Sequence, residues 1–116
     1  MGKELDAIMK RILKFREERD WRQFHDPKNL SQAIGIEAAE LQELFLWKTN
    51  AESKKLSPVE LQSATYEVAD IFIFLLYFCK EFNIDLFKAV NDKIKVNGEK
   101  YPVNKAKGNS KKYDEL

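Results

Sequence analysis

The chain has 116 residues, enough for one domain with a modest core, yet 44% of its residues are hydrophobic and eight are phenylalanine. Twenty basic and nineteen acidic residues leave a formal charge of +1, which gives no overall attraction to nucleic acid or to a membrane surface. Because so small a core cannot bury all of this apolar surface, we expect a homo-oligomer with neither nucleic acid nor membrane as partner.

Cysteine usage and the N-terminal composition both favour the cytoplasm. The single cysteine, Cys79, lies in an apolar run, which suits a packing role in a reducing compartment. The first residues lack the apolar segment of a signal peptide. The longest apolar run, residues 68–79, is too short to span a bilayer and is interrupted by Asp70.

Helical periodicity runs through most of the chain, and no strand pattern is found. Residues 5–19 alternate apolar and charged side chains at the spacing of an amphipathic helix. The polar and aromatic segment 20–29 contains a proline and predicts a loop. A second helix is expected to begin near Asn29 or Ser31 and to continue to about Lys48.

Two further helices complete the predicted fold. Residues 57–60, with the sequence Ser-Pro-Val-Glu, predict a capped start for a long third helix that ends near Phe82. Asn83 or Asp85 is expected to cap a fourth helix, which ends within residues 97–102. The predicted fold class is all-α, four-helix bundle-like and oligomeric.

One domain, residues 1–103, is predicted to contain all of these helices. The remaining residues, 104–116, carry several lysines among Asn, Gly and Ser, which is typical of a flexible tail.

Two pairs of carboxylates have the same spacing on neighbouring predicted helices: Glu37 with Glu40, and Glu67 with Asp70. A spacing of three residues puts both acids of a pair on one helix face. Because this face is otherwise apolar, the acids are expected to point inward, where clustered charges need a cation. Oxygen ligands without Cys or His favour Mg²⁺, Mn²⁺ or Ca²⁺, and we expect Mg²⁺, with Mn²⁺ as a substitute.

Other interpretations of the acid pairs remain open. A buried ion-pair network could use Lys48, Lys93 or Lys95. A di-iron site would require Glu-x-x-His pairs, which this chain lacks. The alternative function is a non-catalytic helical oligomer that binds nucleotide or a protein partner.

The loop between the first two helices contains Trp21, Phe24 and the only histidine, His25. These rings either plug the end of the bundle or form a wall on which a base stacks.

If Mg²⁺ carries a phosphate chain, water can attack phosphorus without a protein nucleophile. Since no Gly-rich phosphate loop is present, hydrolysis of a nucleoside polyphosphate outside the P-loop class is indicated.

Glu37-x-x-Glu40 followed by Glu67-x-x-Asp70 resembles the signature of the all-α MazG-like nucleoside triphosphate pyrophosphohydrolases. The string Arg19-Asp20-Trp21-Arg22-Gln23-Phe24-His25 is more specific and resembles the dCTP pyrophosphatase branch. Residues 43–49 and 97–102 also resemble that branch, so the similarity covers nearly the whole chain.

The resemblance implies cleavage of a deoxynucleoside triphosphate to its monophosphate and pyrophosphate, in a tetramer built as a dimer of dimers. It implies four catalytic Mg²⁺ ligands: Glu37, Glu40, Glu67 and Asp70. The residues that it implies for substrate binding are Trp21, Phe24, His25, Trp47, Lys48, Phe74, Asn97, Lys100 and Tyr101.

Two positions depart from the pattern of the animal dCTP enzymes. Where those enzymes have a substrate-contacting His on the first helix, this chain has Ile12, and where they have a Tyr on the third helix, it has Phe74. Hydrogen bonds to the base reject wrong substrates most strongly. We therefore expect activity on dCTP or on related and modified dNTPs rather than strict selectivity for dCTP.

Overall fold

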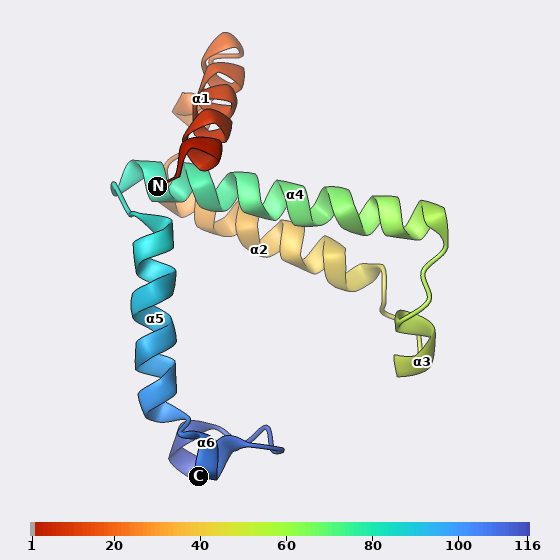
Figure 1. Cartoon of the computed structure of the whole chain (residues 1–116). Coiled ribbons are helices and arrows are strands. Elements are labelled where there is room, and N and C mark those ends of the chain that lie inside the picture. The colour runs from red at the N-terminus through yellow and green to blue at the C-terminus, as the bar shows by residue number, and fades with distance from the viewer. Residues whose placement is uncertain (1) are drawn as a thin grey trace. The chain divides into compact units, whose positions relative to one another are not determined.

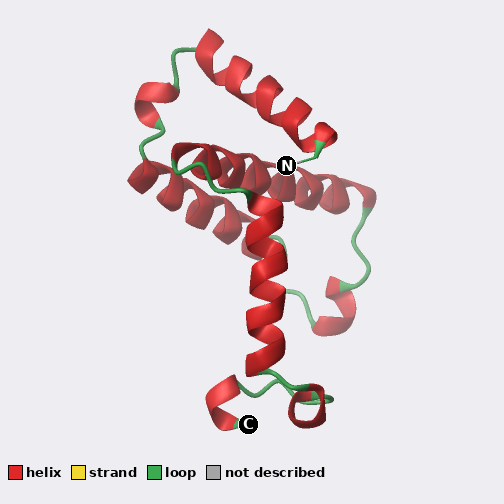
Figure 2. Ribbon diagram, turned by 60° about the vertical axis from the view of Figure 1, so that its left-hand side comes forward, coloured by secondary structure: helices red, strands yellow, loops and turns green. Residues whose placement is uncertain are grey.

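The computed structural model describes residues 2–116, which consist of helices, turns and loops without a strand (Figure 1, Figure 2). The elements in chain order are α1 (Lys3–Glu18), η1 (Arg22–Phe24), α2 (Pro27–Glu43), α3 (Asn50–Ser53), α4 (Pro58–Glu81), α5 (Leu86–Lys100), α6 (Val103–Ala106) and η2 (Tyr113–Glu115). The predicted all-α class and its four long helices are confirmed. The chain divides into two units, residues 2–83 and 84–116, which are described separately.

Helix α4 begins as predicted. The Ser57 hydroxyl accepts a hydrogen bond from the Glu60 backbone N–H at 3.2 Å, and the Glu60 carboxylate accepts one from the Ser57 N–H at 3.0 Å. Pro58 occupies the first turn, where its missing N–H costs no helical hydrogen bond. The three residues therefore set the start of the helix that carries Glu67 and Asp70.

The predicted limits of α2 are wrong at both ends. The helix begins at Pro27, with Asp26 in an extended conformation as its N-cap, rather than at Asn29 or Ser31. Proline is compatible with the first helical turn because its fixed φ suits that position. At the other end, α2 stops at Glu43, and residues 44–47 form a turn.

The connection after α2 contains a helix that the sequence analysis missed. Thr49 and Glu52 form a reciprocal capping box, with hydrogen bonds of 3.1 Å in both directions, and this starts the one-turn helix α3.

In unit 84–116, α5 ends at Lys100, inside the predicted interval. The predicted tail, residues 104–116, begins inside α6 and contains η2, where the Tyr113 ring centroid lies 6.3 Å from that of Tyr101. The Lys100 ammonium lies 4.7 Å from the Tyr113 ring centroid. The domain boundary after Val103 and the flexibility of the tail stay predictions.

The core of unit 2–83 is built around α4, which lies side by side with α2 and makes a smaller contact with α1 (Figure 1, Figure 2). Leu30 of α2 and Leu76 of α4 are fully buried, and burial of each such side chain contributes about 1.5–3 kcal/mol. The buried apolar residues are Leu5, Met9, Leu30, Ala64, Leu76, Tyr77 and Cys79.

Within residues 2–83, one face of α4 carries the exposed apolar side chains of Val68, Phe72 and Leu75. By length and composition alone, this 24-residue helix is long and apolar enough to cross a membrane, which differs from the prediction based on the apolar run 68–79. Glu67 and Asp70 lie in its middle, where carboxylates would be costly in hydrocarbon. The absence of a membrane partner therefore stays a prediction.

Candidate active site

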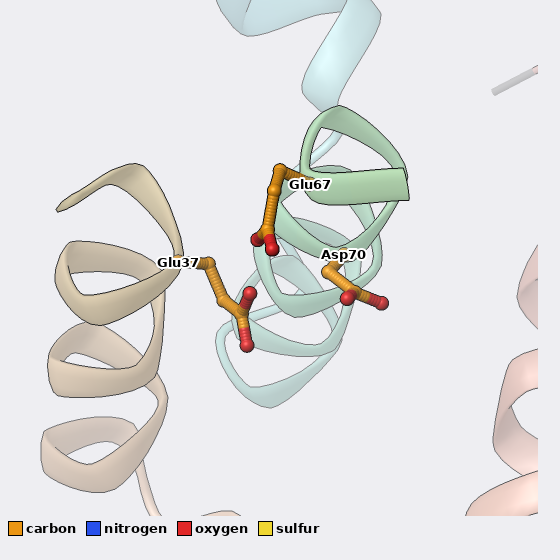
Figure 3. A group of neighbouring side chains, drawn as sticks. All are labelled: Glu37, Glu67 and Asp70. Carbon is orange, nitrogen blue, oxygen red and sulfur yellow. The ribbon is translucent and has the colours of Figure 1, made fainter. Parts of the chain in front are cut away.

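Three carboxylates converge where α2 lies beside α4 (Figure 3). Glu37 comes from α2, and Glu67 and Asp70 come from one face of α4. One carboxylate oxygen from each residue lies within 4.8 Å of the other two. Figure 3 shows the Glu37 and Glu67 side chains pointing toward one another across the gap between the helices.

The four acids differ in exposure. Glu37 and Glu67 are half-buried between the helices, whereas Glu40 and Asp70 are exposed. Glu37 and Glu67 are thus shielded between the helices, as predicted, whereas Glu40 and Asp70 are more exposed than predicted, although Asp70 still joins the group of three. Glu40 is outside the group of three but close enough for its charge to raise the pKa of Glu37.

The pKa of Glu37 is raised to about 7. The largest cause is the hydrogen bond that a protonated Glu37 would donate to the Glu67 carboxylate, followed by burial and by the charges of Glu40 and Asp70. The Oε2 atoms of Glu37 and Glu67 are buried, and no donor group of the described chain reaches them. A proton therefore relieves part of the repulsion among these carboxylates.

This donor set fits a hard divalent cation, because it offers several carboxylate oxygens in one place and two of them are buried without a partner. The competing ion-pair network is not found: none of the ion pairs within residues 2–116 involves these four acids. Lys48, one of the proposed partners, pairs with Glu60 instead. The coarse prediction of an acidic cluster able to hold a metal is confirmed.

A cavity of about 540 Å³ lies beside the acids, between α1, the loop that follows it and α4. Its lining is mostly apolar and aromatic, as is usual for small-molecule pockets. The lining residues are Ile8, Arg11, Ile12, Phe15, Trp21, His25, Asp70, Ile73, Phe74 and Tyr77. Asp70 belongs to both the cavity and the acid cluster, so a ligand in this cavity would lie next to the carboxylates of the cluster.

The loop residues reach the cavity because α1 ends abruptly. The Trp21 N–H donates to the Arg16 carbonyl at 3.0 Å, and Asp20 adopts a positive φ of 52°. The Trp21 ring then packs edge-on against Phe15, with ring centroids 5.7 Å apart. The two rings form one side of the pocket.

His25 is held by two aromatic rings of α4. Its ring centroid lies 6.1 Å from that of Phe74 and 5.0 Å from that of Tyr77. The His25 Nδ1 atom is buried and has no hydrogen-bond partner among residues 2–116. Burial, and then the positive charge of Arg16, lower the pKa of His25, so the ring is neutral at pH 7 and has one donor and one acceptor nitrogen.

Several predicted substrate residues lie away from this cavity. Phe24 is exposed outside it, and the Trp47 ring, 91% exposed, extends from the turn after α2. Lys48 is bound to Glu60. Asn97, Lys100 and Tyr101 lie at the end of α5, in the unit that is described separately. The roles of all these residues stay predictions.

The structure adds pocket residues that the sequence analysis missed, among them Arg11 and Tyr77. Helix spacing could have found some of them. Ile73 and Tyr77 follow Asp70 by three and seven residues, and Ile8, Arg11 and Phe15 follow one another at intervals of three and four.

Fold and site together define an all-α protein with a carboxylate cluster, able to hold a metal ion, at the edge of an aromatic pocket. The MazG-like family matches residues 32–116. Human dCTP pyrophosphatase 1 is 40% identical over 114 residues, which are 97% of this chain and 67% of the human protein. The rat protein of the same name is 38% identical over the same shares of both chains.

A solved structure, that of a pyrophosphatase from Archaeoglobus fulgidus, superposes with a TM-score of 0.82 at 33% sequence identity. The superposition covers 88% of this chain and 95% of the archaeal one. The chain belongs to the MazG-like family, and the predicted fold is confirmed.

Proposed function

We propose that this protein hydrolyses deoxynucleoside triphosphates to the monophosphate and pyrophosphate with Mg²⁺, acting on dCTP or on related and modified dNTPs, as a house-cleaning enzyme of the nucleotide pool. The observation that carries the proposal is the double placement of Asp70, in the acid cluster and in the aromatic pocket. A base in the pocket would leave its phosphates next to the metal site.

The predicted enzyme class is confirmed. Family membership, together with relatives called dCTP pyrophosphatase and a structural neighbour called a pyrophosphatase, makes this chain a nucleoside triphosphate pyrophosphohydrolase. The choice of Mg²⁺ and of a dNTP belongs to the proposal. Mg²⁺ suits an all-oxygen site that shares its ion with substrate phosphates.

Glu37, Glu67 and Asp70 would hold the ion, with Glu40 close by on α2. A bound divalent cation neutralises phosphate charge and activates water for attack on phosphorus. The half-buried positions of Glu37 and Glu67 hold their carboxylates in place before the substrate arrives. Trp21 and Phe74 offer ring faces and edges to the base, and His25 offers it a hydrogen bond.

The assembly and the compartment are also part of the proposal. A homotetramer, built as a dimer of dimers, is supported by the exposed apolar face of α4, which a second copy would cover. Cytoplasmic location is supported by the composition, with its single cysteine, now found buried on α4.

The test is pyrophosphate release from a panel of dNTPs and NTPs, including 5-substituted dCTP analogues, with Mg²⁺ and with EDTA. We expect metal-dependent release from dCTP or its analogues. Lack of turnover on every member would contradict the proposal. In that case, calorimetry measures whether the same nucleotides bind. Mg²⁺-dependent binding without product formation would favour the alternative function, a non-catalytic nucleotide-binding oligomer.

A further inference from the structure

A charged side chain lies in the interior where α1 meets α4. Arg16 is 2% exposed, and its Nε and Nη1 atoms are buried without a hydrogen-bond partner from the described residues. Its Nη1 lies 3.7 Å from the Glu81 carboxylate, which is a loose ion pair. Its Cζ lies 4.7 Å from the centroid of the Tyr77 ring, so the ring face replaces part of the lost hydration.

Tyr77 connects this arginine to the nucleotide pocket. The side chain is almost fully buried, and its hydroxyl donates to the Ile12 carbonyl of α1 at 2.6 Å. Its ring also lines the cavity and lies against His25, with 35° between the two ring planes. One side chain of α4 therefore contacts α1, the buried arginine and the loop histidine.

These contacts matter because α1 touches α4 much less than α2 does. α1 carries Ile12 and Phe15, which form one wall of the pocket, and the Arg16 carbonyl accepts a hydrogen bond from the Trp21 N–H. The position of this wall relative to Asp70 then depends on a small number of long-range contacts, in which Arg16 and Tyr77 take part.

We propose that Arg16 and Tyr77 are positioning residues that fix the His25 ring and the α1 wall of the pocket, and so set which bases the pocket accepts. The selectivity part rests on the proposed function, because it assumes that the pocket receives a base. The fixing of His25 does not, since these contacts are made by the protein alone.

The charge of Arg16 also affects the chemical state of His25. Burial and the Arg16 charge lower the pKa of His25, while the Glu81 charge raises it. Arg11 and Asp70 line the same cavity and are exposed to solvent. A neutral imidazole suits hydrogen bonding to a base edge better than charge pairing with phosphate.

The first measurement is NMR of the imidazole, because His25 is the only histidine in the chain. Tyr77→Phe removes the hydroxyl with little change of volume, and Tyr66→Phe is the matched control, because Tyr66 is exposed on the same helix. We expect the His25 ring resonances of the nucleotide-free protein to move in Tyr77→Phe and to stay in Tyr66→Phe. Arg16→Met removes a positive charge and should raise the measured pKa of His25. Arg16→Lys keeps the charge and should leave this pKa close to that of the wild type.

The second measurement is kinetic. We expect Tyr77→Phe to raise KM for the best dNTP about five- to tenfold and to narrow the differences in kcat/KM among bases. Its kcat at saturation and its Mg²⁺ affinity should stay within about twofold of the wild type. This KM-specific loss would not follow from a general loss of stability, which would lower the amount of active enzyme.

Unchanged His25 resonances in both Tyr77→Phe and Arg16→Met would overturn the proposal, and so would a fall in kcat with unchanged KM and selectivity. If Arg16→Met does not fold, the His25 resonances and the kinetics of Tyr77→Phe, which is close in volume to the wild type, still decide whether the proposal holds. If the His25 resonances move in Tyr77→Phe but the wild-type protein turns over no nucleotide, the positioning role is supported and the proposed function is contradicted. The two failures are therefore distinguishable.

Discussion

The acid cluster and the aromatic pocket share Asp70 but are built in different ways. The cluster lies between α2 and α4, which contact one another along much of their length. The pocket lies between α1, a loop and α4, where the contacts are few and depend on Arg16 and Tyr77. The more extensive of the two helix contacts thus carries the acid cluster, and the less extensive one lines the pocket.

The largest effect is expected where the two regions meet. Asp70→Asn keeps the shape of the side chain but removes one negative charge from the cluster, so metal binding and stabilisation of the phosphates are weakened. We expect pyrophosphate release to fall at least about 100-fold. Glu43→Gln, one turn beyond Glu40 on α2, is the matched control and should keep activity. Full activity in Asp70→Asn would show that the acid cluster is not required for catalysis.

A smaller effect is expected from changing the pocket alone. Ile12→His combined with Phe74→Tyr introduces the two polar residues that the resemblance to the animal dCTP enzymes implies at these positions, and both Ile12 and Phe74 line the cavity. We expect the ratio of kcat/KM for dCTP over dTTP to rise about tenfold, while Mg²⁺ affinity is unchanged. An unchanged ratio would show that other residues select the base.

The smallest effect concerns the cluster without metal. The pKa of Glu37, about 7 when folded against 4.5 in an unfolded chain, means that the folded protein retains a proton that the unfolded chain releases. This contribution to the free energy of unfolding is complete below about pH 4.5 and is lost as the pH rises through about 7. In EDTA, we expect Tm to fall by a few °C between about pH 6 and pH 8.

Glu37→Gln should reduce the fall of Tm with rising pH, because an amide does not titrate. Saturating Mg²⁺ should have the same effect, because the cation replaces the proton. A metal-free Tm that rises over this range, or a decrease of equal size in Glu37→Gln, would contradict the raised pKa of Glu37.

Much of the fold and part of the site follow from local sequence. Helical periodicity predicts the long helices, and Ser57 and Glu60 predict the start of α4, because capping depends on residues three positions apart. The same spacing puts Glu67 and Asp70 on one face of that helix. The start of α2 was predicted too late because Asn29 and Ser31, although good N-cap residues, follow Asp26 and Pro27, which already form a compatible start.

Only the tertiary structure decided which of these residues meet. Glu37 lies opposite Glu67 through the register in which α2 packs against α4, and this register leaves Glu40 outside the group of three. The contact of Tyr77 with Ile12 joins residues 65 positions apart. Local spacing determines which side chains share a helix face, but packing between helices is a balance of many side chains distant in sequence, and that balance decides which faces form a site.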